Sequence, residues 1–169
     1  MKVDIIPISS LRLQKVQYYS VFLEGHDKLE FRDFQQRMSV GEKDKFELGE
    51  INRYIQKIGN RHGARPAHFR DEDAAEGLPP PYHQFLETNM FGDFGLRLYC
   101  IRLSPSIVIL LNGDRKTTLK AQECANCRPH FERARRIAKQ ISQAILDGYI
   151  EIDEDKREMI IDRDFELFI

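Results

Sequence analysis

Residues 94–117 read FGLRLYCIRLSPSIVILLNGDRKT, and this stretch shapes the expected fold more than any other. In LRLYCIRL, residues 96–103, the alternation of a β-strand places Arg97 and Tyr99 on one face. SIVILL, residues 106–111, is apolar on both faces and therefore predicts a central strand. Because only a Ser-Pro turn separates the two segments, we expect them to form an antiparallel hairpin.

Two strands and two helices are expected before this hairpin. VDIIPI, residues 3–8, and VQYYSVFLEG, residues 16–25, are rich in β-branched and aromatic side chains, which favour strands. Apolar side chains at three- and four-residue spacings predict helices near 28–38 and over 41–58. Residues 60–94 contain most of the chain's prolines and several turn signals, so we expect a long surface loop there.

A long helix and a second hairpin are expected after the central strands. RPHFERARRIAKQISQAIL, residues 128–146, has one apolar stripe, with Arg133, Arg136 and Lys139 on the opposite side. YIEIDEDKREMII, residues 149–161, is typical of a small hairpin. This order of elements predicts an α+β fold with a mostly antiparallel, twisted sheet and with helices packed on one of its faces.

The expected organisation is a single domain over residues 1–169. A chain of 169 residues is long enough to bury one sizeable core. We expect residues 1–120 to form that core, and residues 121–169 to add the long helix and an acidic hairpin as an extension.

The composition indicates a cytoplasmic protein. Its three cysteines are an odd number, which argues against a disulfide framework and suits a reducing compartment. No stretch approaches the roughly 20 apolar residues that span a bilayer, so no membrane contact is expected. The net charge of -1 hides an asymmetry, because residues 95–145 carry ten basic and three acidic side chains, whereas residues 146–169 carry three and nine.

A basic cluster is predicted at the end of the central hairpin. Arg97 and Tyr99 lie on one strand, and Arg115 and Lys116 follow the neighbouring strand. We expect these four side chains to converge at one edge of the sheet. Guanidinium groups bind phosphate through two hydrogen bonds at once, and an aromatic ring beside them can stack on an unpaired base. The cluster therefore indicates single-stranded RNA as a ligand. Further RNA contacts are expected from Arg102, Lys120, Arg133, Arg136 and Lys139.

Neither a cofactor nor a metal ion is expected. Cys124-Ala-Asn-Cys127 has the spacing of half a zinc motif, with His130 and Cys100 as further candidate ligands. Structural zinc needs four ligands, usually from two such pairs, and the second pair is missing. The sequence also has no glycine-rich phosphate loop and no metalloprotease motif.

The central hairpin resembles that of the RelE/HigB-type toxins of toxin–antitoxin systems, on the stretch FGLRLYCIRLSPSIVILLNGDRKT. In that family a strand with an arginine near its start leads through a short turn to an apolar strand, which ends in a turn of small residues and a basic cluster. The resemblance covers about residues 16–120 and rests on the order and pattern of the elements. It implies a RelE-like fold and an endoribonuclease that cleaves messenger RNA, typically on the ribosome, without a metal ion.

The resemblance also implies roles for individual residues. The family uses the 2′-hydroxyl of the RNA as the nucleophile, and cations stabilise the negative charge that develops on phosphorus. Arg97 would correspond to the family's strand arginine, and Arg115 to the arginine after the apolar strand. Lys116 would hold the phosphate or transfer a proton, and Tyr99 is a further candidate for stacking or proton transfer. The implied partners are messenger RNA on the ribosome and an antitoxin with a helix-turn-helix domain.

The chain departs from the family in length, charge and one catalytic position. It is longer than typical members and close to neutral, and TTLKAQECANC, residues 117–127, offers neither the tyrosine nor the histidine that usually follows the basic turn. These departures leave two alternatives open. One is a catalytically silent module of the same fold that binds RNA or protein. The other is a structural protein whose basic groups are solvated or paired with residues 151–166.

Overall fold

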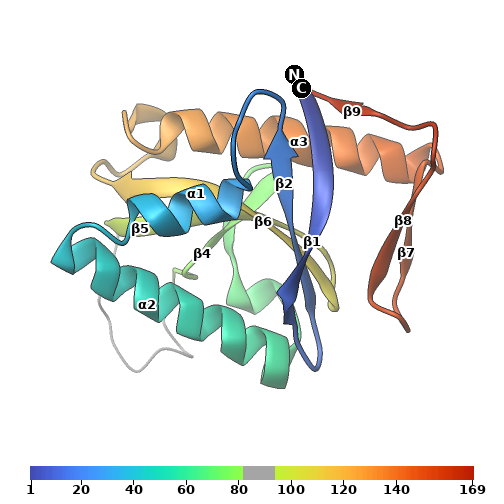
Figure 1. Ribbon diagram of the computed structural model, residues 1–169. Coiled ribbons are helices and arrows are strands. Elements are labelled where there is room, and N and C mark those ends of the chain that lie inside the picture. Colours follow the sequence, from blue (N-terminus) through green and yellow to red (C-terminus); the bar gives the residue numbers. More distant parts are fainter. Residues whose placement is uncertain (82–93) are drawn as a thin grey trace.

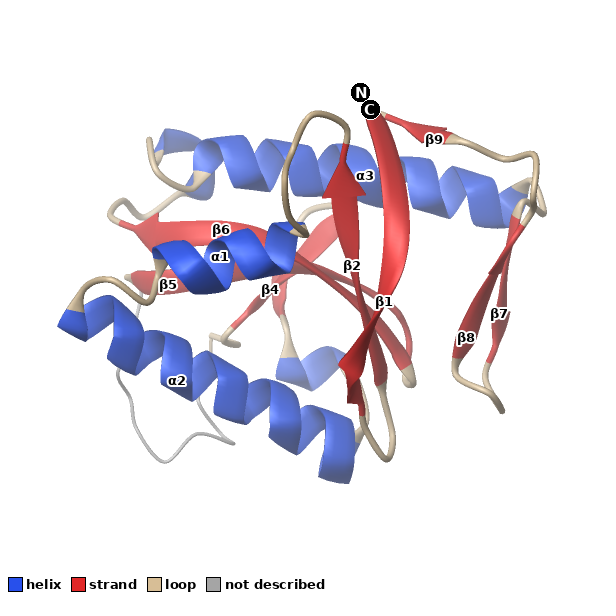
Figure 2. Cartoon of the chain, viewed as in Figure 1, coloured by secondary structure: helices blue, strands red, loops and turns tan. Residues whose placement is uncertain are grey.

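The computed structural model describes residues 1–81 and 94–169. These residues form a seven-stranded sheet, a two-stranded sheet and three α-helices (Figures 1 and 2). The strands are β1 (Lys2–Arg12), β2 (Gln17–Leu23), β3 (Arg70–Glu72), β4 (Ala75–Leu78), β5 (Gly95–Ser104), β6 (Ile107–Lys116), β7 (Ile150–Asp153), β8 (Glu158–Ile161) and β9 (Leu167–Phe168). The helices are α1 (Glu30–Arg37), α2 (Glu42–Lys57) and α3 (Arg128–Leu146).

The large sheet has the strand order β3-β4-β5-β6-β2-β1-β9. Its strands pair in antiparallel fashion except at one place, where β2 runs parallel to β6. The mostly antiparallel sheet confirms the predicted α+β class. β5 and β6 form the predicted hairpin in the middle of the sheet, and β7 and β8 form the predicted second hairpin beside it.

Helices cover both faces of the sheet, so the prediction that they pack on one face is wrong. Leu98 and Cys100 of β5 contact the layer of α1 and α2, whereas Tyr99 and Ile101 face α3. Figure 1 shows α3 on one side of the sheet and the other two helices on the opposite side. The physical reason lies in β5 and β6 themselves, because strands that are apolar on both faces must be covered on both sides. No helix in the described ranges is both long and apolar enough to cross a membrane.

Residues 121–169 share a hydrophobic core with the strands that precede them. Phe131 and Ile137 of α3 pack in one buried cluster with Val21 of β2. β9 pairs with β1, and the backbone N–H of Met159 in β8 donates to the Tyr19 hydroxyl over 2.9 Å. The segment expected as an extension therefore forms a whole layer of the molecule.

Part of the loop predicted for residues 60–94 belongs to the sheet. β3 and β4 form a short hairpin that pairs with β5, with Gly77 opposite Tyr99 and Leu78 opposite Leu98. These strands have three and four residues, so they carry too few side chains to show an alternating pattern. Residues 82–93, the rest of the predicted loop, lie outside the described residues.

Gly113 lies in the part of β6 that is paired with β5 but no longer with β2. The parallel pairing stops at Ser20 and Leu110, but β6 runs on to Lys116 with α1 beside it. A Cβ atom at Gly113 would lie 1.7 Å from the carbonyl oxygen of Arg97 on β5. Only glycine permits this close approach of the two backbones, which is why the apolar strand contains one.

Candidate functional site

The β5–β6 hairpin distributes the four predicted catalytic residues over both faces of the sheet. Lys116 stands opposite Gly95 in the hairpin register, and it therefore shares a face with Arg97 and Tyr99. Arg115 stands opposite Leu96 and points to the other face. The prediction that all four side chains converge is wrong for Arg115.

Arg115 is held by carboxylates of α2. Its guanidinium forms an ion pair with Asp44, with 2.8 Å between Nε and Oδ1, and a second ion pair with Glu47. The Glu47 side chain is almost fully buried, so this pair fastens α2 to the sheet. Arg115 is thus not available to a phosphate group on the α3 side.

Arg97 and Lys116 belong to a group of charged residues on the α3 side of the sheet. Arg70 and Glu72 of β3 lie on the same face, and the electrostatic effects on Lys116 come from Arg97, Glu72 and Arg70. We call Arg70, Glu72, Arg97 and Lys116 the recessed basic cluster. Arg97 is fully buried and Lys116 is only 9% exposed, whereas Arg70 and Glu72 are half-buried.

Burial and mutual repulsion shift the pKa values in the recessed basic cluster. Burial, reinforced by Arg70, lowers the pKa of Arg97 to about 10. Burial also lowers the pKa of Lys116, with Arg97 acting in the same direction and Glu72 opposing it. The pKa of Glu72 is raised by burial, which outweighs the neighbouring cations. A cluster of this kind makes proton loss from lysine easier than in water.

Tyr99 is a packed core side chain. It is fully buried, and its ring contacts that of Phe131 edge to face at 5.9 Å between centroids. Its hydroxyl lies beside the Cys127 thiol, and burial strongly raises its pKa. With its ring enclosed by α3, Tyr99 cannot stack on a nucleobase in this conformation.

The five predicted RNA-binding residues fall into two groups. Arg102 forms a bidentate ion pair with Glu76, at 3.2 Å and 3.0 Å, and Arg133 pairs with Glu30 at 3.3 Å. The other three residues are exposed, and they are Lys120, Arg136 and Lys139. Lys120 lies 3.9 Å from Glu123, a contact of little energetic value at an exposed site.

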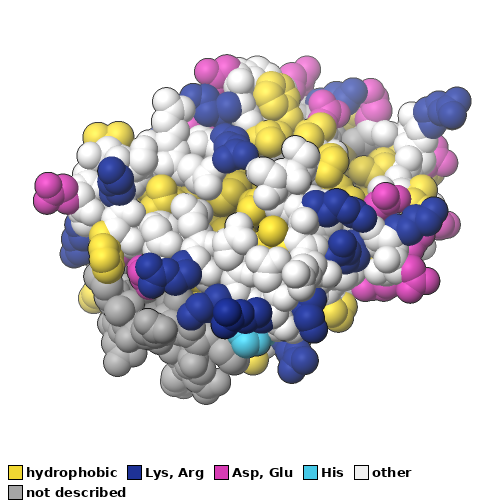
Figure 3. Space-filling view, turned by 60° about the horizontal axis from the view of Figure 1, so that its bottom comes forward, with side chains coloured by type: hydrophobic (Ala, Val, Ile, Leu, Met, Phe, Trp, Pro, Cys, Tyr) yellow, Lys and Arg dark blue, Asp and Glu magenta, His cyan; other side chains and the backbone are white. Residues whose placement is uncertain are grey.

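A basic face that the sequence prediction did not include lies where α2 ends. Figure 3 shows lysine and arginine side chains gathered over this part of the molecule. We call Lys15, Arg53, Lys57, Arg61 and Arg65 the basic face; all are exposed except Lys57, which is half-buried. The β1–β2 turn contributes Lys15, and it is fixed against the end of α2 because the Lys15 N–H donates to the Gly59 carbonyl over 2.7 Å. Glu50 pairs with Arg53 at 3.3 Å.

The sequence contains a signal for the basic face. Residues 53–70 carry five lysines and arginines and no aspartate or glutamate. Three of these cations, Arg53, Lys57 and Arg61, recur at a spacing of four, which places them along one side of a helix. A scan for local charge within a nearly neutral chain would have found them.

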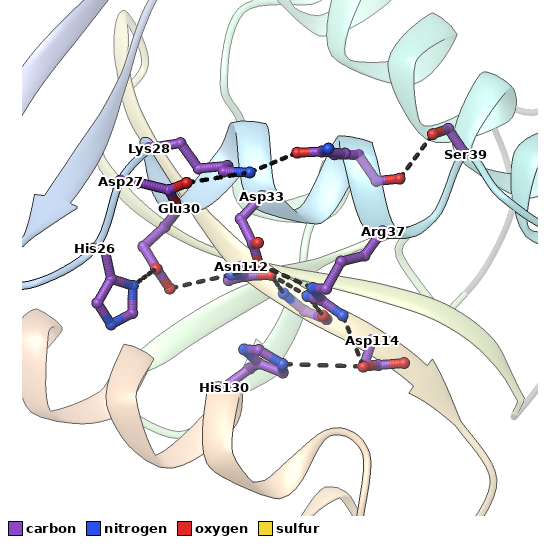
Figure 4. Close-up of polar contacts among 12 residues, drawn as sticks. His26, Asp27, Lys28, Glu30, Asp33, Arg37, Ser39, Asn112, Asp114 and His130 are labelled. Carbon is purple, nitrogen blue, oxygen red and sulfur yellow. Dashed lines mark hydrogen bonds and ion pairs between the residues drawn. The ribbon is translucent and has the colours of Figure 1, made fainter.

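A second group of polar residues joins α1, β6 and α3 (Figure 4). Arg37 donates to Asp33 at 2.8 Å, to Asp114 at 2.9 Å and to the Gly113 carbonyl at 2.7 Å. Arg37 thus provides a hydrogen-bond donor to the backbone of β6 at a point where β2 no longer pairs with it. The interlayer polar cluster consists of Glu30, Asp33, Arg37, Asn112, Asp114 and His130.

Each carboxylate of the interlayer polar cluster has a donor. Asn112 donates to Glu30 at 3.2 Å and to Asp33 at 2.9 Å. Burial alone would raise the pKa of Asp33, but the hydrogen bonds from Asn112 and Arg37 outweigh it and lower the pKa. Burial, with help from Arg37, lowers the pKa of His130 to about 4. A network whose carboxylates are all paired, beside a neutral histidine, serves to join the layers.

The described residues offer no metal site. No group of three or more histidine, cysteine, aspartate or glutamate side chains in residues 1–81 and 94–169 is placed to hold a metal ion. Cys100 faces the α1–α2 layer, whereas Cys124 and Cys127 lie in the core on the α3 side. The sheet therefore separates Cys100 from Cys124 and Cys127.

Comparison of the chain with protein-family models, with curated proteins and with solved structures finds no match.

Proposed function

We propose that this chain is an RNA-binding protein and that the basic face is its contact with RNA. The observation that carries the proposal is the gathering of five cations along one side of the molecule, four of them exposed and Lys57 half-buried. The negatively charged phosphate groups of a single strand follow one another along the backbone. A row of positively charged lysine and arginine side chains along a helix complements them. Because the net charge of the chain is -1, a local concentration of cations is what would attract a polyanion.

The resemblance of the β5–β6 hairpin to RelE/HigB-type toxins supports RNA as the polyanion. It is a resemblance of pattern and order, and it points to a fold whose members act on messenger RNA. An acidic protein would be attracted by the same face, so the experiment has to distinguish the two.

RNA binding is tested by fluorescence anisotropy with a short labelled single-stranded RNA. The variant Lys15→Ala/Arg61→Ala/Arg65→Ala removes three exposed cations of the basic face. We expect roughly tenfold weaker binding or more, and a slope of log K against log salt that is smaller in magnitude by about 2, because each phosphate contact contributes about 0.7 on a single strand.

The matched control is Lys120→Ala/Arg136→Ala/Lys139→Ala, which removes three exposed cations elsewhere. We expect this variant to bind RNA as the unchanged chain does. The proposal is wrong if the control loses affinity while the basic-face variant keeps it. It is also wrong if polyglutamate competes as well as unlabelled RNA at equal charge.

An endoribonuclease of the RelE/HigB toxin type is a second candidate, favoured by the grouping of Arg97, Lys116 and Arg70 on one face. In this reaction the 2′-oxygen loses its proton and attacks phosphorus, the bond to the 5′-oxygen breaks, and that oxygen takes up a proton. Lys116, with its lowered pKa, is the candidate proton acceptor, and Arg97 would stabilise the charge on the phosphoryl oxygens. Arg115 has no part in this version, because it faces α2.

Cleavage is tested by induction of the chain in growing cells and by incubation with RNA. If the candidate is right, induction arrests growth, Lys116→Gln lowers cleavage by at least about 100-fold, and co-expression of a helix-turn-helix antitoxin restores growth. A 2′-deoxy substitution at the cut position should block cleavage. If cells that express the unchanged chain and cells that express Lys116→Gln at the same level grow equally well, the toxin function is excluded. The proposal of RNA binding by the basic face would not be affected.

A further inference from the structure

Cys124 and Cys127 form a pair of thiols at the start of α3. Cys124 ends the short 3-10 turn that precedes the helix, and Cys127 immediately precedes its first residue. The backbone N–H of Arg128 donates to the Cys124 carbonyl over 2.9 Å, which closes a helical turn around the pair. Residues three apart in a turn have Cα atoms within about 7 Å, the range that a disulfide bridges. The two side chains are close enough for each to influence the pKa of the other.

The surroundings of the two sulfur atoms differ. Thr117 donates to Cys124 Sγ from its backbone N–H at 3.5 Å, and its hydroxyl lies 3.6 Å from the same sulfur. Both thiols also donate to carbonyl groups of β6, Cys124 to Arg115 at 3.6 Å and Cys127 to Asp114 at 3.5 Å. Donors stabilise a thiolate, and Thr117 offers its N–H and its hydroxyl to Cys124, so Cys124 is the nucleophile of the pair and Cys127 is the protonated partner.

The pKa values follow this geometry. Burial would raise the pKa of Cys124, but the hydrogen bonds from Thr117 and Cys127 lower it to about 7. Burial and the neighbouring Cys124 raise the pKa of Cys127 to about 12. About half of Cys124 is therefore thiolate near pH 7, whereas an ordinary cysteine is mostly thiol.

We propose that Cys124 and Cys127 are a dithiol that hydrogen peroxide oxidises to an intramolecular disulfide. The Cys124 thiolate attacks one peroxide oxygen, the O–O bond breaks, and the products are a sulfenic acid and hydroxide. The Cys127 thiol then attacks the oxidised sulfur, which releases water and forms the S–S bond. The sulfur pair loses two electrons and peroxide gains two.

Both side chains are buried, but they belong to a turn whose other residues are exposed. Four neighbours of the pair are exposed, and they are Gln122, Glu123, Ala125 and Asn126. A peroxide molecule is small, and it needs only a local opening of this turn to reach Cys124. The third cysteine, Cys100, is buried on the opposite face of the sheet and has no thiol partner among the described residues.

Oxidation would act on the end of β6. Both sulfur atoms contact its backbone, since Cys124 Sγ lies 3.6 Å from the Arg115 carbonyl and Cys127 Sγ contacts Asp114. A disulfide would remove these two hydrogen bonds from the end of β6, next to Lys116, while the pairing of this strand end with β5 would remain. This inference does not depend on the proposed RNA function.

The reduced, full-length chain is treated with hydrogen peroxide and analysed by intact mass and thiol alkylation. We expect the loss of two hydrogen atoms and of two of the three alkylatable thiols, both reversed by dithiothreitol. The reaction rate should rise less than about twofold between pH 7.5 and pH 9, where a thiol of ordinary pKa speeds up about eightfold.

Three variants assign the reaction to the pair. Cys127→Ser should stop at a sulfenic acid that dimedone traps, Cys124→Ser should not react, and Cys100→Ser should behave like the unchanged chain. Circular dichroism checks that each variant folds, and the pH profile of the unchanged chain provides a test if one does not. The inference is overturned if only unfolded chain reacts, if Cys100 reacts as fast, or if no disulfide forms.

Discussion

At the scale of single residues, Asn112 and Gly113 solve two different constraints at the point where β6 leaves β2. Gly113 lets the backbone of β5 approach more closely than any Cβ would allow. Asn112 is buried, and its amide donates to Glu30 and Asp33 of α1. Residues 112 and 113 of β6 thus contact two different elements: Gly113 packs against the backbone of β5, and Asn112 binds α1.

His130 makes the stability of the fold depend on pH. It faces Asp114 of β6, with 4.0 Å between Nε2 and Oδ2, and Arg37 and Asp33 of α1, with Arg133 nearby on its own helix. Because the pKa is about 4 in the folded chain and near 6.5 in the unfolded chain, the unfolded chain binds the proton more readily. The contribution of His130 is complete above pH 6.5 and is lost as the pH falls towards 4.

Acidification from pH 7.5 to pH 4.5 should lower the unfolding free energy of both the unchanged chain and the His130→Gln variant. We expect the loss to be larger in the unchanged chain, by up to about 3 kcal/mol. Urea denaturation at several pH values measures this difference. The glutamine side chain is polar but does not titrate. The pH dependence of this variant therefore reports the contribution of the carboxylates alone. Identical pH profiles for the two proteins would contradict the assigned role.

The sequence predicts which residues carry charge better than it predicts where they point. Arg115 and Lys116 are neighbours, and the prediction that they converge assumes that both follow the end of the strand. β6 instead continues to Lys116, and consecutive side chains of a strand point to opposite faces. Arg97 does share a face with Lys116, but its complete burial depends on tertiary packing.

At the scale of elements, the ion pairs of Arg115 hold α2 against β6. Glu47 is almost fully buried, so removal of its cationic partner leaves an uncompensated charge in the protein. Arg115 therefore contributes to structure at a position where the family resemblance implied catalysis.

Arg115→Ala should lower the unfolding free energy by about 3 kcal/mol. The double variant Arg115→Ala/Glu47→Gln should recover part of this loss, because the buried charge is then absent. Chemical denaturation measures the unfolding free energy of both variants. The control is Arg128→Ala, which removes the exposed ion pair with Glu132 and should change the unfolding free energy by less than about 1 kcal/mol. A double variant less stable than the single one would contradict this explanation.

Elements with strong periodicity were predictable, and short polar ones were not. β1, β2, β5, β6 and the three helices carry enough apolar side chains to reveal their period. β3 consists of Arg70-Asp71-Glu72, which reads as loop, and it becomes a strand because β4 offers it a backbone partner. β4 in turn pairs with β5, where Leu78 stands opposite Leu98, and a pairing between segments this far apart in the chain leaves no local signal.

At the scale of the whole molecule, one sheet separates two hydrophobic clusters. The cluster on the α3 side and the cluster on the α1–α2 side each draw on alternate residues of the same central strands. The charged residues follow the same division, because Arg97 and Lys116 belong to one side and Arg115 to the other. The basic face lies outside both, at the lower end of α2 in Figure 1, and so it is open to a large ligand.

The parallel pairing of β2 with β6 is short, and it joins residues far apart in the chain. It extends from Gln17 opposite Ile107 to Ser20 opposite Leu110, a sequence separation of 90 residues. The β1–β2 and β5–β6 hairpins can each form from nearby residues, but their union must close a loop of this length against its entropy. Few hydrogen bonds compensate for that entropy loss. The contacts of α1 with both β2 and β6 therefore contribute much of the free energy that holds the two hairpins together. A change that weakens α1 would thus loosen the sheet at its middle before its edges.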